Sequence, residues 1–133
     1  MMLDIRLLLG NKTILALAVI YTCTITVLFL MPSTDLPRVK LPGGSDKWVH
    51  LLIHFVLVGF WMLYLFRQNN NRLLWKHSVT VLLVSLLYGI IIEILQGCLT
   101  ASRTPDFFDV IANFSGALVG VFVFQKVKHF FTP

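Results

Sequence analysis

The sequence predicts an all-α integral membrane protein, a bundle of four transmembrane helices with both termini on the cytoplasmic side. Of its 133 residues, 57% are hydrophobic and only 13% are charged, which is far from the mixture of a soluble domain. The apolar residues fall in four blocks separated by short clusters of charge, Pro, Gly and Asn. Each block is continuously apolar for roughly 16–25 residues, whereas a membrane β-strand alternates over about 9–11. Residues 1–133 are therefore expected to form a single transmembrane domain.

The first helix is predicted over residues 13–33. Its apolar run follows Arg6 and Lys12 and so resembles a secretory signal peptide. However, the run is longer than a signal core of about 7–15 residues, and its end lacks a small-x-small cleavage site. We therefore expect this segment to be retained as a helix that is ended by Pro32.

The second helix is predicted over residues 48–66, the third over 77–99 and the fourth over 108–126. The fourth apolar block, from 110 to 125, has 16 residues and would cover only about 24 Å as a helix. It is the shortest of the four blocks. Its helix is therefore expected either to reach the membrane surface through the side chains of Lys126 and Lys128 or to lie where the bilayer is thin. Polar side chains interrupt the second and third runs: His50, His54, Glu93 and Gln96.

The basic residues predict the orientation of the helices. The net charge is +5, but the chain has no Lys/Arg run of the kind that binds nucleic acid, and its basic residues lie at the ends of the apolar blocks. Seven of the eleven fall at the termini and in the second loop, and four in the first and third loops. This asymmetry places the termini inside. Asp4 is then inside, and the remaining aspartates lie on the outer side: Asp35, Asp46, Asp106 and Asp109.

The two cysteines do not indicate a disulfide. Cys23 lies in the middle of the first apolar block, whereas Cys98 lies near the outer end of the third. The two thiols are therefore expected at different depths, and no metal-type cysteine spacing is present.

Polar side chains from three helices are expected to meet just below the outer boundary. At about 1.5 Å per residue, His54 lies about 10 Å below Lys47, Asn113 about 6 Å below Asp109, and Glu93 about 5 Å below the boundary. In the second helix, Lys47, His50 and His54 share one stripe. In the fourth, a single face is formed by five residues: Asp106, Asp109, Asn113, Gly116 and Gly120. The last two form a GxxxG pattern that lets helices approach closely.

Glu93 is the most informative of these side chains. An ionisable residue among lipid tails costs about 2.5–3.5 kcal/mol, so Glu93 must find a partner or be protonated. Two readings are open. A structural ion pair with Arg103, His54 or Lys47 would fix helix packing, whereas a functional site would bind or transform a ligand.

The order of these residues resembles the VanZ-like family. The resemblance rests on Asp46-Lys47-x-x-His50, on Gly89-x-x-x-Glu93-x-x-Gln96, and on Arg103-x-x-Asp106-x-x-Asp109-x-x-x-Asn113-x-x-Gly116-x-x-x-Gly120. It implies a multi-pass protein of the bacterial cytoplasmic membrane. The family's namesake is associated with low-level resistance to teicoplanin, a lipoglycopeptide that binds cell-wall precursors outside the membrane. His54 departs from the family pattern, which more often has Tyr there, so a two-histidine metal site is set aside and no cofactor is predicted.

Three functions remain open from the sequence. The first is a binding protein for an envelope lipid or cell-wall precursor, with Lys47 and Arg103 as candidate cations for a phosphate or carboxylate. The second is an intramembrane acid–base enzyme in which Glu93 or Asp109 is the base and His50 carries a proton. The third is a proton-linked transporter or accessory subunit.

The expected partners are membrane lipids, a lipid-linked precursor or a lipoglycopeptide, with no nucleic acid, and the chain is compatible with an oligomer. Helix packing is assigned to Gly89, Gly116 and Gly120. The ligand-binding candidates are Asp46, Lys47, His50, His54, Glu93, Gln96, Arg103, Asp106, Asp109 and Asn113.

Overall fold

The computed structural model describes residues 10–32, 34 and 43–132, and in this part of the chain it contains helices and no strands. The helices are α2 (Asn11–Leu30), α3 (Ser45–Gln68), α4 (Trp75–Leu99), α5 (Phe107–Val127) and a short 3-10 helix, η1 (Lys128–Phe131). Four helical segments are each long and apolar enough to cross a membrane. The all-α, four-helix membrane fold is thus confirmed.

The side of the membrane on which the termini lie stays a prediction. Part of the charge count behind that prediction falls outside the described residues, namely Asp4, Arg6, Asp35, Arg38 and Lys40.

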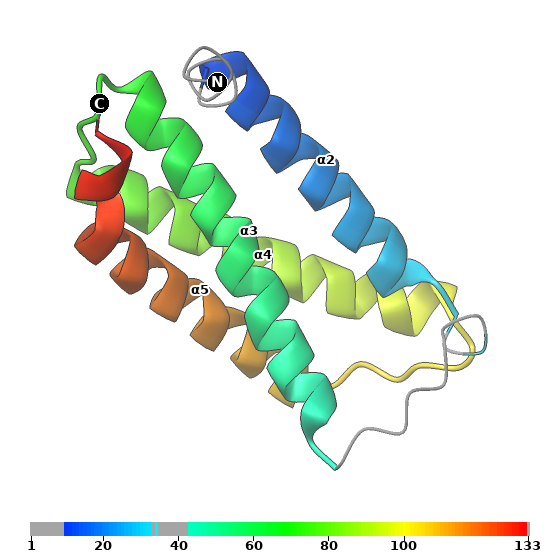
Figure 1. Ribbon diagram of the computed structural model, residues 1–133. Coiled ribbons are helices and arrows are strands. Elements are labelled where there is room, and N and C mark those ends of the chain that lie inside the picture. The colour runs from blue at the N-terminus through cyan, green and yellow to red at the C-terminus, as the bar shows by residue number, and fades with distance from the viewer. Residues whose placement is uncertain (1–9, 33, 35–42, 133) are drawn as a thin grey trace.

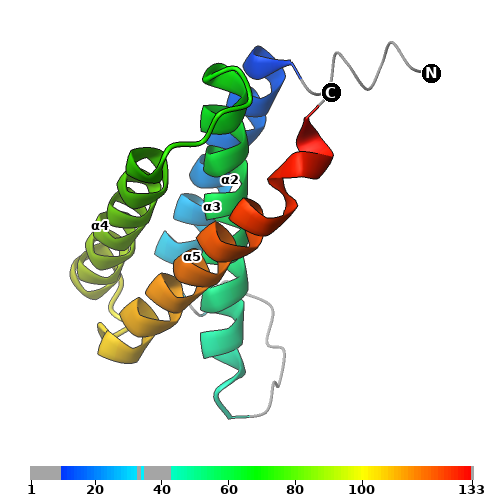
Figure 2. The same cartoon turned by 90° about the vertical axis from the view of Figure 1, so that its left-hand side faces the viewer.

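The central element of the bundle is α3, which contacts each of the other three long helices and packs most extensively against α5 (Figures 1 and 2). The helix α2 packs on α3 and α4, and α4 also packs on α5. Consecutive helices run in opposite directions, so the start of α3, the end of α4 and the start of α5 come together at one end of the bundle (Figure 1). The polar residues of the second, third and fourth helices that the sequence analysis singled out lie toward that end.

The fourth helix is longer than its apolar block suggests. The helix α5 has 21 residues and η1 extends the apolar segment to 25, so the membrane-crossing length is not limited to that block. The helix begins earlier because Asp106 caps it, accepting a hydrogen bond from the Phe108 backbone N–H at 2.8 Å. A hydropathy profile cannot predict this helix start, because the capping residue Asp106 and Asp109 in the first turn are both polar.

The outer surface of the bundle is apolar, as expected for a surface facing lipid. Large hydrophobic side chains are exposed on all four long helices, among them Ile20, Leu52, Leu87 and Phe122. The exposed indoles of Trp48 and Trp75 belong to the first turns of α3 and α4, at opposite ends of the bundle. Tryptophan at both ends of apolar helices is typical of the two interfacial layers of a membrane.

Two glycines explain the close packing of α3 and α5. A Cβ atom at Gly116 would overlap the backbone carbonyl group of Leu51, and one at Gly120 would lie 3.0 Å from the carbonyl oxygen of Phe55. The GxxxG face predicted from the sequence is therefore the face of α5 that lies on the backbone of α3. This close approach determines how far the polar side chains of α5 reach toward those of α3.

Candidate functional site

Lys47 lies between three carboxylates at the polar end of the bundle. Its Nζ donates to Asp46 at 3.0 Å and to Asp106 at 2.5 Å, and it also contacts Asp109. Lys47 belongs to the first turn of α3, whereas Asp106 and Asp109 cap and begin α5. The ammonium group is thus occupied by acids of this chain, which leaves it poorly placed to hold a ligand phosphate.

Asp106 lies just outside the membrane-spanning segments and shows the electrostatic effect of this arrangement. The hydrogen bond from Lys47, followed by the one from the Phe108 N–H, holds the pKa of the Asp106 carboxyl below its usual value. Asp106 is therefore a carboxylate at neutral pH, which keeps both its ion pair and its helix cap in place.

The imidazole of His50 is held between α5 and α2. Its Nδ1 is 3.1 Å from the Oδ1 of Asn113, and its Nε2 is 3.6 Å from the Oδ2 of Asp109. The ring also stacks on Phe29, with centroids 5.0 Å apart. Because an amide oxygen can only accept, the contact with Asn113 assigns the proton of a neutral imidazole to Nδ1. The lone pair of Nε2 is then directed toward Asp109.

Glu93 reaches the same region from α4 and is 4% exposed. Its Oε2 accepts the backbone N–H of Asp106 at 3.1 Å, whereas its Oε1 has no hydrogen-bond partner among the described residues. Of the two readings left open by the sequence, the structural ion pair of Glu93 with Arg103, His54 or Lys47 is not formed among the described residues. Instead, the loop after α4 brings a backbone N–H to the carboxylate.

The position of that loop depends on Gly97, one turn after Glu93. A Cβ atom at Gly97 would lie 2.5 Å from the ring of Pro105, so only glycine lets the proline lie directly on α4. Pro105 precedes Asp106, and its packing therefore directs the Asp106 N–H at Glu93. Sequence reasoning missed Gly97, although it continues a four-residue spacing that runs from the helix-packing Gly89 through Glu93, which was a usable signal.

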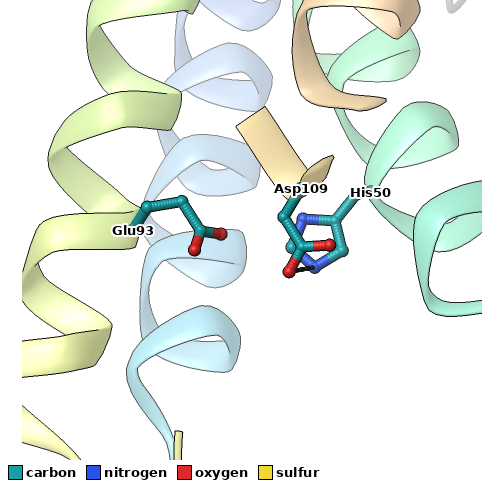
Figure 3. Close-up of side chains that lie close together, drawn as sticks. All are labelled: His50, Glu93 and Asp109. Carbon is teal, nitrogen blue, oxygen red and sulfur yellow. Dashed lines mark ion pairs between the residues drawn. The ribbon is translucent and has the colours of Figure 1, made fainter. Parts of the chain in front are cut away.

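Three of the predicted residues converge from three different helices (Figure 3). One ligand-type atom from each of His50, Glu93 and Asp109 lies within 4.8 Å of the others. Figure 3 shows the Glu93 carboxylate pointing from α4 toward the other two side chains. It also shows the ion pair between His50 and Asp109. We call these three residues the acidic triad.

His54 lies one turn deeper along α3 than the acidic triad and is fully buried. Its Nδ1 is 3.0 Å from the Ser85 hydroxyl, and its Nε2 has no hydrogen-bond partner in the described part of the chain. Gly89 provides the necessary room, because a Cβ there would lie 3.2 Å from Asn113 and 3.5 Å from His54. Ser85 was not singled out from the sequence, since a single serine in an apolar helix carries no distinctive signal.

Other predicted site residues lie at the edge of this region. Gln96 donates to the Phe29 carbonyl oxygen at 2.8 Å, and the Arg103 guanidinium donates to the same oxygen at 3.4 Å. Both side chains therefore satisfy a carbonyl in the last turn of α2, a structural role that attaches α2 to α4 and its following loop. Asp46 touches Lys47 from the exposed outer side, with 61% of its side chain accessible.

Deeper in the bundle than His54 and Ser85, the interior becomes apolar. The buried core there is formed by Val58, Met62, Phe66, Val81, Ala117 and Phe124. Beside it, an apolar groove of about 260 Å³ runs between α2, α3 and α4, and its lining includes Thr22, Trp61, Ser85 and Tyr88. Ser85 bonds to His54, and the Tyr88 ring lies 5.8 Å from that imidazole, so the groove adjoins the polar region.

Comparison with protein-family models gives a match that covers most of the chain. The model of a protein family described as VanZ/LLP1 matches residues 13–129, which include all four long helices except the first two residues of α2. No curated protein and no solved structure matches the chain.

Proposed function

Because the chain belongs to the VanZ/LLP1 family and has four helices able to cross a membrane, we propose that it binds the headgroup of an envelope lipid at its polar end. The ligand class is a membrane lipid or a lipid-linked cell-wall precursor of the bacterial cytoplasmic membrane. By occupying that precursor, the protein would alter the access of a lipoglycopeptide such as teicoplanin and contribute to resistance.

The depth of the acidic triad supports a headgroup ligand. Glu93 lies six residues before Leu99, the last residue of α4, and is thus about 9 Å from that helix end. Asp109 is in the first turn of α5. In a bilayer this level corresponds to the region where lipid headgroups meet the hydrocarbon core. A ligand confined to the membrane surface would meet the triad without having to enter the apolar core.

The observation that carries the proposal is the buried, unpartnered Oε1 of Glu93, whose carboxylate converges with the side chains of His50 and Asp109. A buried acceptor without a donor costs free energy, which a ligand hydroxyl, amide or ammonium group would recover by donating to it. Among the described residues at this end of the bundle, four carboxylates outnumber the two cations, Lys47 and Arg103, and Lys47 contacts three of the carboxylates. The charge balance therefore favours donors and cations over a bare phosphate.

The apolar groove beside His54 and Ser85 supports the proposal that the ligand is a lipid. Its lining is almost entirely apolar and it adjoins Ser85 and Tyr88, next to His54. A lipid with its headgroup at the acidic triad would place one acyl or prenyl chain along this groove. Chain and headgroup would then bind one continuous surface.

The same geometry gives a specific reason for a second candidate function, an acid–base enzyme acting on the lipid-linked substrate. The lone pair of His50 Nε2 and the Oε1 of Glu93 are both available to take up a proton. A transport function has less support, because a path across the membrane needs polar groups along its length. Beyond the acidic triad, His54 and Ser85, the interior is the apolar core around Val58 and Met62.

Lipid analysis of the purified protein tests the proposal. Wild type, extracted in mild detergent, should retain a defined envelope lipid, and Glu93→Gln and Asp109→Asn should lose most of it. Gln125→Ala, at the other end of α5, is the matched control and should retain the lipid. Equal lipid content in all four proteins would refute a headgroup site at the triad. An altered lipid, absent from cells carrying Glu93→Gln, would identify the enzyme instead of the binder.

A cellular experiment tests the link to lipoglycopeptides. In a susceptible Gram-positive host, wild-type protein should reduce sensitivity to teicoplanin more than to vancomycin. Glu93→Gln should not do so at equal membrane abundance. No change with wild type would contradict the resistance role while leaving lipid binding to be judged by the extraction.

The proposed orientation has its own measurement. Cys23 and Cys98 are free, so both are first replaced by Ser, and Thr104→Cys is then introduced in the exposed loop before α5. A membrane-impermeant thiol reagent should label this cysteine in intact cells. Labelling that requires broken cells would place the polar end in the cytosol and contradict the external site.

A further inference from the structure

We infer that the acidic triad, His50, Glu93 and Asp109, is a binding site for one divalent transition-metal ion such as Zn²⁺ or Mn²⁺. The inference goes beyond the proposed function, since the ion would bind whether or not a lipid is present. It also differs from the two-histidine site set aside above, because His54 is held by Ser85 in the deeper layer.

The first support is the chemistry of the three side chains. The triad offers one imidazole nitrogen and two carboxylate oxygens, all within 4.8 Å of one another and contributed by α3, α4 and α5 (Figure 3). Mixed nitrogen and oxygen ligands of this kind suit Zn²⁺ and Mn²⁺, whereas Mg²⁺ and Ca²⁺ prefer oxygen alone. Metal bonds of about 2.0–2.2 Å would bring the ligand atoms to about 3–3.6 Å, so the side chains must close by roughly 1 Å.

The second support is the orientation of each ligand atom by a neighbour. The Asn113 oxygen fixes the His50 proton on Nδ1 and leaves Nε2 as the ligand atom. The Asp106 N–H holds the Oε2 of Glu93, and Lys47 contacts the Oδ1 of Asp109. One atom of each ligand is thus anchored from outside, which is the arrangement typical of metal-binding histidines and carboxylates.

The third and decisive support is an excess of acceptors inside the triad. Glu93 Oε1 is buried and has no hydrogen-bond partner within the described ranges, and one carboxylate oxygen of Glu93 lies within 4.8 Å of a ring nitrogen of His50 and a carboxylate oxygen of Asp109. With both carboxyl groups ionised and the imidazole neutral, the three acceptors have no donor between them and repel. A proton on Nε2 relieves this repulsion by forming the His50–Asp109 ion pair, and a metal ion competes with that proton. A divalent cation removes that repulsion and leaves coordination positions open for water or a headgroup oxygen.

Metal binding to the purified, tag-free protein in detergent tests this inference. After treatment with a chelator, wild type should bind one Zn²⁺ per chain in competition with a chromophoric chelator, and Mn²⁺ should compete for the same site. Glu93→Gln and Asp109→Asn should each weaken Zn²⁺ binding at least 10-fold. His77→Ala and His129→Ala remove histidines at the other end of the bundle and should leave the affinity unchanged.

Several outcomes would overturn the site. These are failure of wild type to bind either ion, binding by Glu93→Gln as tight as that of wild type, and loss of binding when His77 and His129 are replaced.

Wild type alone decides the question if the triad variants do not fold. Electron paramagnetic resonance of the Cu²⁺-loaded protein should show one coordinating imidazole nitrogen, whereas two or more would refute the triad. Lipid retention is read separately, so failure of the metal site and failure of the headgroup proposal are distinguishable.

Discussion

Replacing Gly116 with alanine should loosen the α3–α5 interface that brings the acidic triad together. The added Cβ would lie 2.8 Å from the carbonyl carbon of Leu51 and 3.0 Å from its Cα, and would overlap the carbonyl oxygen. These are backbone atoms and cannot rotate away. Since carbon atoms pack best at about 3.5–4.0 Å, α5 must move away from α3 by roughly 1 Å.

The expected cost follows from that displacement. Overpacking in a close-packed interface costs about 1–3 kcal/mol, and a clash with backbone lies at the upper end of that range. Alanine recovers up to about 1 kcal/mol of helix propensity over glycine. We therefore expect Gly116→Ala to lower the free energy of unfolding by about 2 kcal/mol.

Two other glycines provide a graded comparison. At Gly120 the added Cβ would lie 3.0 Å from the Phe55 carbonyl oxygen and 3.3 Å from the Val58 side chain, so the loss should be smaller, about 1 kcal/mol. At Gly59 no atom lies within 4 Å, so alanine should be neutral or stabilising by up to about 1 kcal/mol.

Equilibrium unfolding of the three variants in one detergent, by increasing fractions of sodium dodecyl sulfate, measures this order. The reasoning predicts Gly116→Ala as the least stable and Gly59→Ala as the most stable. If Gly116→Ala proved as stable as Gly59→Ala, the close approach of α5 to the Leu51 backbone would be wrong. Reduced lipid retention by folded Gly116→Ala would further link this interface to the polar site.

Two more predictions concern the polar end and the attachment of α2. Because Lys47 lowers the pKa of the Asp106 carboxyl, the stability from that charge should be fully present above its unfolded pKa of about 3.9 and lost as the pH falls through the folded value. Asp106→Asn keeps a side chain that can cap the helix but removes the charge. Its thermal midpoint should therefore lie below that of wild type at neutral pH and approach it only below about pH 4. A constant difference from pH 7 to 3 would contradict the ion pair. The Tyr88 hydroxyl lies 2.7 Å from that of Thr26, which donates to the Thr22 carbonyl, so a double-mutant cycle of Tyr88→Phe and Thr26→Val should give a coupling of about 0.6–1.7 kcal/mol. A coupling of zero would mean that this bond does not hold α2 to α4.

The pairing of the acids and bases shows where sequence reasoning stopped. The spacing of Lys47 and His50 on one helix, and the helical depth of Glu93, were sufficient to expect these groups near a common level. Their partners were not predictable. Glu93 accepts a backbone N–H of Asp106, and a backbone donor has no signature in the sequence because every residue except proline provides one. The route of the loop depends on the contact of Pro105 with Gly97, which is a three-dimensional fit.

The sequence by itself determined the fold class and the number of membrane-crossing helices. Lipid contributes no hydrogen bonds, so a long apolar run must satisfy its backbone internally as a helix, and that requirement is local. Tertiary structure alone decided which side chains meet. The distance between α3 and α5 depends on Gly116 facing the Leu51 backbone, and the grouping of His50, Glu93 and Asp109 depends on three helices meeting at fixed rotations. Contacts between helices arise from packing across long sequence separations, which no local pattern of residues encodes.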